Sequence, residues 1–197
     1  RALSSLVMSL EKKGIHFQYR HIANSTATAG IPAATAAPYN MARCGIDLHG
    51  AHLSITPRPY VTSPVLTLKS RLVAIRHFPP GTTVGYGRTY RVSRKEGELV
   101  GVVSFGYADG YPRCLSNTGQ MLVRGQRCRV VGRVCMDYTM VLLDNVPDVC
   151  VGDDVVIIGK QEDAHISLGE VARAAETIPY EIICCLGRRV ERCYIRQ

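Results

Sequence analysis

The apolar positions that open the chain recur at the spacing of an α-helix, at Leu3, Leu6, Val7 and Leu10. Positions three and four residues apart lie on one helical face, so the pattern predicts a helix near residues 2–13. Two lysines and Gly14 follow, and a basic last turn with a glycine beyond it commonly ends a helix.

Two further apolar runs come next, at residues 15–23 and 40–50. Each has the length of a strand, and Asn24 and Ser25 form a turn between them that can cap the following segment. An order of helix, strand, connection and strand is typical of an α/β unit with parallel strands. Three prolines at positions 57, 59 and 64 then indicate a domain boundary.

Beyond these prolines the apolar pattern takes the period of two that is typical of strands. Gly, Pro and Asp turns separate five strand candidates, at residues 65–78, 97–107, 121–131, 132–143 and 153–159. Within them, residues 124–127 resemble the tip of a hairpin. Short strands at this spacing predict a closed or nearly closed antiparallel barrel or sandwich.

One helix is predicted after these strands. Ser167 and Glu170 form a capping box, and the apolar side chains that follow share one helical face, at Leu168, Val171, Ala172 and Ala175. Together with the first part of the chain, this predicts an α+β fold with a mainly antiparallel second part.

Composition places the chain among ordinary globular proteins, with 46% hydrophobic and 20% charged residues. No apolar run approaches the roughly 20 residues that a membrane-spanning helix needs, so we expect no membrane partner and a cytoplasmic location. The eight cysteines form no C-x-x-C pair, so we expect no metal site.

The formal charge of +8 raises an alternative, a basic β-barrel module that binds nucleic acid or another anion. The arginines are scattered, however, and form one local cluster, at Arg188, Arg189, Arg192 and Arg196. The chain has no tryptophan, and its tyrosines lie in glycine motifs instead of alternating with arginine along a strand. We therefore favour the interpretation that most of the arginines lie on solvent-exposed faces, and expect no nucleic-acid partner.

The most specific signal is three glycine-rich motifs, GYGRTY at 85–90, FGYADGYPR at 105–113 and GRVCMDYTM at 132–140. Glycine lets the backbone approach a ligand closely. With HIANS at 21–25 and NMARCGI at 40–46, the motifs resemble the C-terminal part of alanine racemase, a pyridoxal-phosphate enzyme that inverts the α-carbon of a small amino acid. The resemblance covers essentially the whole chain.

This resemblance implies two parts. Residues 1–58 would be the last strands and helices of a TIM-type (β/α)8 barrel that binds pyridoxal phosphate, and residues 59–197 an antiparallel β domain. The implied reaction interconverts L- and D-alanine by two-base proton transfer at the α-carbon. A racemase of the same family that acts on serine or another small amino acid is the alternative.

The resemblance also implies cofactor-binding residues, at His21, Ser25, Arg43, Gly45, Ile46 and Tyr180. Ser25, the backbone at Gly45 and Ile46, and Tyr180 would hold the phosphate. Arg43 would face the pyridine nitrogen, which would stay unprotonated because arginine keeps its own proton. Judged from the residues alone, an arginine on a buried strand is explained by a bound anion or by a structural salt bridge.

Tyr86 is the expected catalytic residue. Racemisation needs a proton carrier on each face of the α-carbon, and the resemblance assigns one face to Tyr86 and the other to the cofactor lysine. A free tyrosine titrates near pH 10, so this role needs nearby positive charge, for which Arg43 and Arg88 are candidates. Substrate-binding roles are implied for Met136, Asp137 and Tyr107.

The family's lysine motif is absent, because the five lysines, at 12, 13, 69, 95 and 160, stand in other contexts. The chain is therefore expected to be a C-terminal fragment of a longer enzyme. In the family, Tyr86 and Met136 would serve the active site of the partner subunit in a homodimer. Without the preceding half, residues 1–58 are expected to expose apolar edges.

Overall fold

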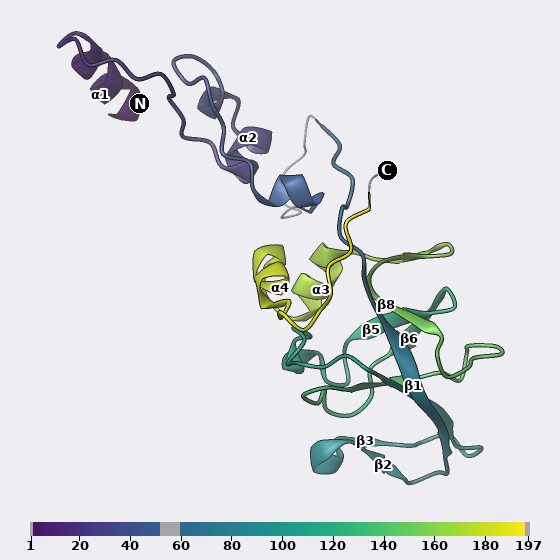
Figure 1. The fold of residues 1–197 in the computed structure, drawn as a ribbon. Coiled ribbons are helices and arrows are strands. Elements are labelled where there is room, and N and C mark those ends of the chain that lie inside the picture. Colours follow the sequence, from purple (N-terminus) through teal and green to yellow (C-terminus); the bar gives the residue numbers. More distant parts are fainter. Residues whose placement is uncertain (1, 52–59, 196–197) are drawn as a thin grey trace. The chain divides into compact units, whose positions relative to one another are not determined.

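The computed structural model describes residues 2–51 and 60–195, which divide into two compact units, residues 1–65 and 66–197 (Figure 1). The described residues of the first unit form two α-helices and two short 3-10 helices: α1 (Ala2–Glu11), α2 (Ser25–Gly30), η1 (Pro32–Ala34) and η2 (Ile46–His49). The boundary predicted between 58 and 59 falls outside the described residues. None of the described helices has the length and apolar character needed to span a bilayer.

Helix α1 is confirmed and ends two residues before the predicted end at 13. The predicted cap of the next segment also forms, because the Asn24 side chain accepts a hydrogen bond from the Ala27 N–H at 2.9 Å. This bond satisfies one of the N–H groups that a helix start leaves without an internal partner.

The two strands predicted at 15–23 and 40–50 are wrong. Between them the described residues form a single parallel bridge, Asn24 with Arg43, and η2 occupies the end of the second run. A strand exists where a neighbouring strand takes up its N–H and C=O groups along its length. Here the two runs share only isolated backbone bonds, from the Asn40 N–H to the Arg20 carbonyl and from the Arg43 N–H to the Ala23 carbonyl. The partial (β/α)8 barrel is therefore not confirmed.

The apolar side chains of the first predicted strand remain uncovered within this unit. Ile15, Phe17 and Tyr19 are all exposed. Apolar side chains are usually buried in a folded protein, so the sequence pattern predicts burial here. It does so whether or not the segment that would cover these side chains is part of the chain.

The second unit is mainly antiparallel sheet. Its strands are β1 (Leu68–Phe78), β2 (Thr83–Val84), β3 (Tyr90–Arg91), β4 (Glu98–Val103), β5 (Gln120–Val123), β6 (Gln126–Arg129), β7 (Thr139–Leu142), β8 (Asp154–Gln161) and β9 (Ala164–Ile166). The helical segments are η3 (Tyr86–Arg88), η4 (Arg113–Leu115), α3 (Leu168–Ala174) and α4 (Pro179–Cys185). Two helices stand where one was predicted, because Pro179 starts a second one.

The seven-stranded sheet has the order β6-β5-β8-β1-β4-β7, with β9 paired to β8. Its two ends approach each other through one antiparallel bridge, Val130 with Val141. The described residues form no continuous ladder there, so the sheet is not a closed barrel. Strand β7 is much shorter than the predicted 132–143, because residues 132–138 form a turn that carries site residues.

Buried side chains of this sheet and its loops form the core of the unit. Its largest fully buried side chains include Leu72, Met121, Leu122, Leu143 and Ile157. The predicted hairpin tip is confirmed between β5 and β6, where Arg124 and Gly125 both have positive φ, at 46° and 69°. Positive φ at both central positions is the mark of a tight type I′ turn.

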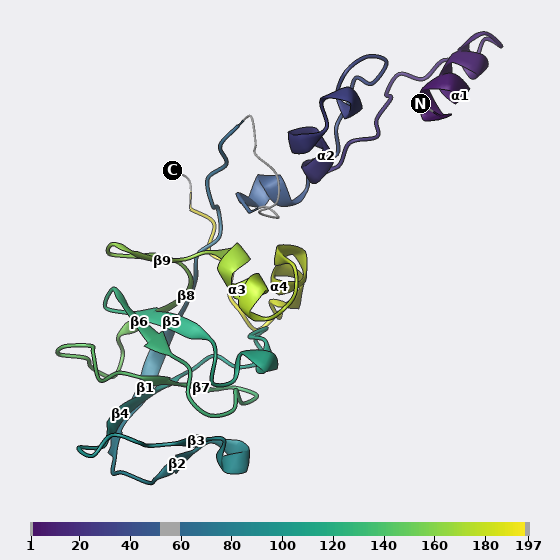
Figure 2. The ribbon, with the colours of Figure 1, turned by 180° about the vertical axis from the view of Figure 1, so that it is seen from behind.

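Helices α3 and α4 lie side by side next to this sheet, and the two-stranded ribbon of β2 and β3 lies at the end of the unit away from β9 (Figure 2). The ribbon is joined by η3, which contains Tyr86. The fold thus presents Tyr86 on a short projecting ribbon.

Candidate active site

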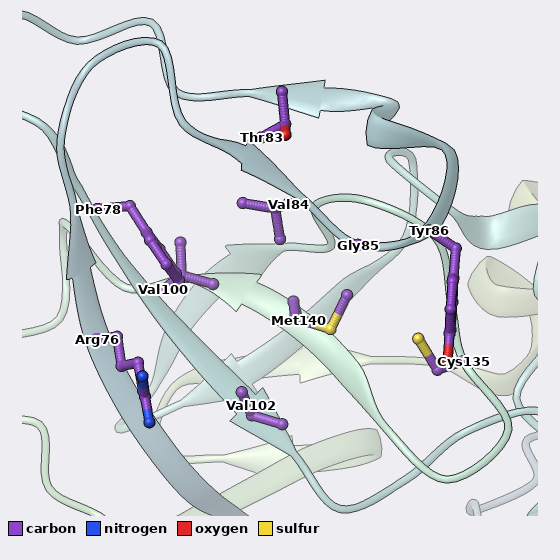
Figure 3. A pocket seen from close by; sticks show the side chains of 10 residues that line it. All are labelled: Arg76, Phe78, Thr83, Val84, Gly85, Tyr86, Val100, Val102, Cys135 and Met140. Atoms are coloured by element: carbon purple, nitrogen blue, oxygen red, sulfur yellow. The ribbon is translucent and has the colours of Figure 1, made fainter.

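Tyr86 lies on a turn that only glycine-rich sequence can form. Gly85 and Gly87 on either side have φ of +76° and +71°, a region that costs other residues energy. The Tyr86 side chain is 75% exposed and extends from the turn toward Cys135 (Figure 3). Its phenol is therefore accessible.

A second loop, residues 106–110, packs against the turn at 135–138. The Tyr107 N–H donates to the Cys135 carbonyl and the Ala108 N–H to the Met136 carbonyl, both at 3.0 Å. A Cβ atom on Gly106 would lie 2.3 Å from the Met136 oxygen, so this backbone approach requires glycine. The packing fixes Tyr107 beside Met136.

These turns enclose a cavity of about 530 Å³ that brings together four of the predicted site residues, Tyr86, Tyr107, Met136 and Asp137. They come from three separate motifs and meet only in the folded unit. The Met136 side chain is 53% exposed at the cavity.

Two arginines line the same cavity and were not predicted as site residues, Arg113 and Arg133. Both stand within the glycine motifs, in GYPR and GRV, so the motifs themselves held the signal. Their charge makes the cavity suitable for an anion such as a carboxylate. Arg88, expected near Tyr86, does not line the cavity, although it is two residues away in the same turn.

A second cavity, of about 450 Å³, also borders Tyr86 and is mostly apolar (Figure 3). Phe78, Val84, Val100, Val102 and Met140 line it, together with Tyr86 and Cys135, which also line the first cavity. Tyr86 therefore borders both a polar and an apolar cavity.

Arg189 connects the C-terminal segment to the polar cavity. Its guanidinium donates to Asp137 at 2.7 Å and lies 3.1 Å from Asp109. The bond to Asp137, together with the charge of Asp109, raises the pKa of Arg189 above its ordinary value. Asp109 is 7% exposed, and it also accepts the Gly106 N–H at 2.9 Å, which closes the loop that carries Tyr107.

In the first unit, Ser25 and Gly45 are brought together. The Ser25 side chain is buried and accepts the Gly45 N–H at 2.9 Å, which leaves its own hydroxyl hydrogen to donate. The N–H of Ile46 starts η2 and has no partner within that helix. A Cβ atom on Gly45 would meet nothing within 4 Å, so the backbone there faces open space.

Arg43 and His21 form a pair in the same unit, with Nη1 of Arg43 2.7 Å from Nδ1 of His21. Arginine only donates, so Nδ1 accepts, and a neutral His21 carries its proton on Nε2. Tyr180, on α4 of the second unit, is half-exposed and is not among the residues that line the polar cavity.

Comparison with known proteins places these motifs in context. A family model described as "Alanine racemase, C-terminal domain" matches residues 65–194. The curated alanine racemase of Halothermothrix orenii is 43% identical over 189 residues, which cover 94% of this chain and 48% of that protein. This chain spans about half the length of the curated relatives it matches.

Solved structures agree with these sequence matches. Alanine racemase from Bacillus anthracis with bound L-Ala-P superimposes with a TM-score of 0.86 at 36% identity, over 98% of this chain and 48% of that one. Alanine racemase from the D-cycloserine-producing Streptomyces lavendulae gives a TM-score of 0.88 at 34% identity, over 100% of this chain and 50% of that one.

Proposed function

This chain belongs to the alanine racemase family, and we propose that it is the C-terminal half of a pyridoxal-phosphate enzyme that interconverts L- and D-alanine. The observation that carries the proposal is the single cavity lined by Tyr86, Tyr107, Met136 and Asp137. A phenol and two arginines meet there, which suits proton transfer on a small amino acid with a carboxylate.

Tyr86 is the proposed proton carrier on one face of the α-carbon. Its exposed phenol stands at the cavity edge, where a hydroxyl can exchange a proton with a bound substrate. Arg113 and Arg133 line the same cavity, and their charge suits the substrate carboxylate. The backbone N–H of Met136 is proposed to bind that carboxylate.

The residues of the first unit fit a phosphorylated pyridine cofactor. The Ser25 hydroxyl and the first N–H of η2, at Ile46, are donors suited to a phosphate, and Gly45 leaves the space beside them open. Arg43 donates to His21 through one N–H and retains others for a ring nitrogen. When bound, pyridoxal phosphate supplies an electron sink for the α-carbon.

We further propose that the enzyme is a homodimer with composite sites, in which Tyr86 and Met136 serve the partner subunit. Both side chains are largely exposed in the second unit, where a reacting group would be costly to leave uncovered. The covalent lysine would come from the half of the enzyme that this chain does not span. A cytoplasmic location is proposed because all eight cysteines are free thiols, which persist in reducing compartments.

The test is deuterium exchange at the α-carbon by the full-length enzyme that carries this chain. Tyr86→Phe should slow exchange from L-alanine by about 10²- to 10⁴-fold, the usual contribution of one acid-base group, and should affect exchange from D-alanine less. Tyr194→Phe, at a highly exposed tyrosine, is the matched control. Equal and unimpaired exchange from both isomers would exclude Tyr86 as a proton carrier.

A further inference from the structure

Asn117 hydrogen-bonds two of the three loops that build the polar cavity. Its Nδ2 donates to Oγ1 of Thr89 at 3.1 Å, and its Oδ1 accepts the N–H of Gly132 at 2.7 Å. Thr89 directly follows η3, which carries Tyr86, and Gly132 begins the segment that leads to Met136. One amide side chain therefore links the Tyr86 turn to the Met136 segment.

The orientation of this amide follows from its partners. A backbone N–H can only donate, so Oδ1 must face Gly132 and Nδ2 must face Thr89. Asn117 itself has φ of +65°, a left-handed conformation that asparagine adopts more readily than most residues. Both the side chain and the backbone at this position thus call for asparagine.

The two loops approach each other closely through their backbones. A Cβ atom on Gly132 would lie 2.7 Å from the Val84 carbonyl oxygen, and one on Gly85 would lie 3.1 Å from the Arg133 nitrogen. Beside these close backbone contacts, Val84 and Val131 share a buried apolar cluster, which holds the two loops together without directional bonds. The two Asn117 bonds add directional links to this contact, because hydrogen bonds depend on geometry.

We propose that Asn117 is a positioning residue that fixes the Tyr86 turn against the Met136 segment. The effect of Asn117 on catalysis rests on the proposed function of Tyr86. The link that Asn117 makes between the two loops does not depend on that function. A misplacement of about 1 Å can cost about 10²-fold in rate, so loss of the link should lower kcat more than it changes KM.

Two variants separate the two bonds. Asn117→Gly removes both while it keeps the positive φ, and Thr89→Val removes only the bond to the Tyr86 turn while it keeps the side-chain shape. Asp148→Gly, at an exposed turn with φ of +52°, is the control for a glycine in this conformation. Each variant is made in the full-length enzyme, and thermal unfolding confirms that it folds.

The measurements are amide hydrogen exchange, resolved by peptide, and kcat and KM for alanine. Asn117→Gly should speed exchange in both 84–91 and 132–137, and Thr89→Val only in 84–91. Both should lower kcat by about 10- to 100-fold with KM within about twofold. Unchanged exchange in either loop of Asn117→Gly, or a fall in kcat without faster exchange in 84–91 in either variant, would overturn the proposal. Faster exchange in an enzyme whose parent form does not racemise alanine would support the link and reject the proposed function.

Discussion

Arg189 donates a hydrogen bond to Asp137 at 2.7 Å, across 52 residues of chain. Through its second contact, to Asp109, the same guanidinium also holds the loop that carries Tyr107. The C-terminal segment therefore clamps two walls of the polar cavity, although none of its described residues lines it.

Removal of this clamp should weaken substrate binding more than chemistry. Arg189→Met keeps the length of the side chain but leaves Asp109, which is buried, and Asp137 without their cation. Because the guanidinium is half-exposed, we expect a modest rise in KM for alanine, of about two- to fivefold, with a smaller change in kcat. Steady-state kinetics in both directions measure it.

Salt gives an independent check on the same clamp. Exposed ion pairs are screened at high ionic strength, so the difference in KM between the parent enzyme and Arg189→Met should shrink in about 1 M salt. Arg188→Met removes an equal charge from the neighbouring exposed position and is the control. A KM that rises equally in both variants would assign the effect to net charge and not to the clamp.

The β2–β3 ribbon is anchored by Tyr90, whose hydroxyl donates to Oε2 of Glu98 at 2.5 Å. Glu98 is 2% exposed, and its other oxygen accepts the N–H groups of Ser93 and Arg94. Burial by itself raises the pKa of Glu98, but these hydrogen bonds outweigh it and hold the pKa below its ordinary value. Burial, and then the bond to this carboxylate, raises the pKa of Tyr90 to about 12.

These shifts predict that the parent protein loses stability at both ends of the pH scale. The contribution of Glu98 is present above its ordinary pKa near 4.5 and is lost as the pH falls through the lower folded value. That of Tyr90 is present below pH 10 and is lost as the pH rises from 10 toward 12. Urea unfolding across the pH range measures both.

Tyr90→Phe isolates the anchor. We expect it to lower the free energy of unfolding by about 1 to 3 kcal/mol at neutral pH, the range for a hydrogen bond to a charged group. It should also flatten the decline between pH 10 and 12, because the titrating phenol is gone. Tyr138→Phe, at an exposed tyrosine, is the control for loss of a hydroxyl. A decline between pH 10 and 12 that persists undiminished in Tyr90→Phe would show that other groups cause it.

Much of the sheet could be predicted from the sequence because local pattern determines it. The apolar run of β8, from Val155 to Ile158, and the turn at Arg124 and Gly125 need only neighbouring residues to be interpreted. Residues 15–23 were misjudged because their pattern registers a need for burial, which in a strand depends on partners elsewhere. The two-residue strands β2 and β3 are too short for any period to show.

The residues of the site also differ in whether the sequence could predict them. Tyr86, Tyr107 and Met136 stand in glycine motifs whose resemblance to a known family reveals them. Arg189 and Asn117 act through contacts 52 and 28 residues away, and nothing near them in the sequence records the partner. Residues that position a site are therefore found from tertiary structure, whereas residues that react are found from motifs.

Gly106 provides the sharpest test of how the two cavity walls meet. In Gly106→Ala the new methyl group would lie 2.3 Å from the Met136 oxygen and 2.4 Å from the Cys135 oxygen, both rigid backbone atoms. The loops must separate, so we expect a loss of about 1 to 3 kcal/mol in the free energy of unfolding and a rise in KM as Tyr107 moves away from Met136. Gly169→Ala, in the first turn of α3, is the matched control, because alanine suits a helix better than glycine. If Gly106→Ala matched this control in both unfolding and KM, the backbone contact between the walls would be absent in solution.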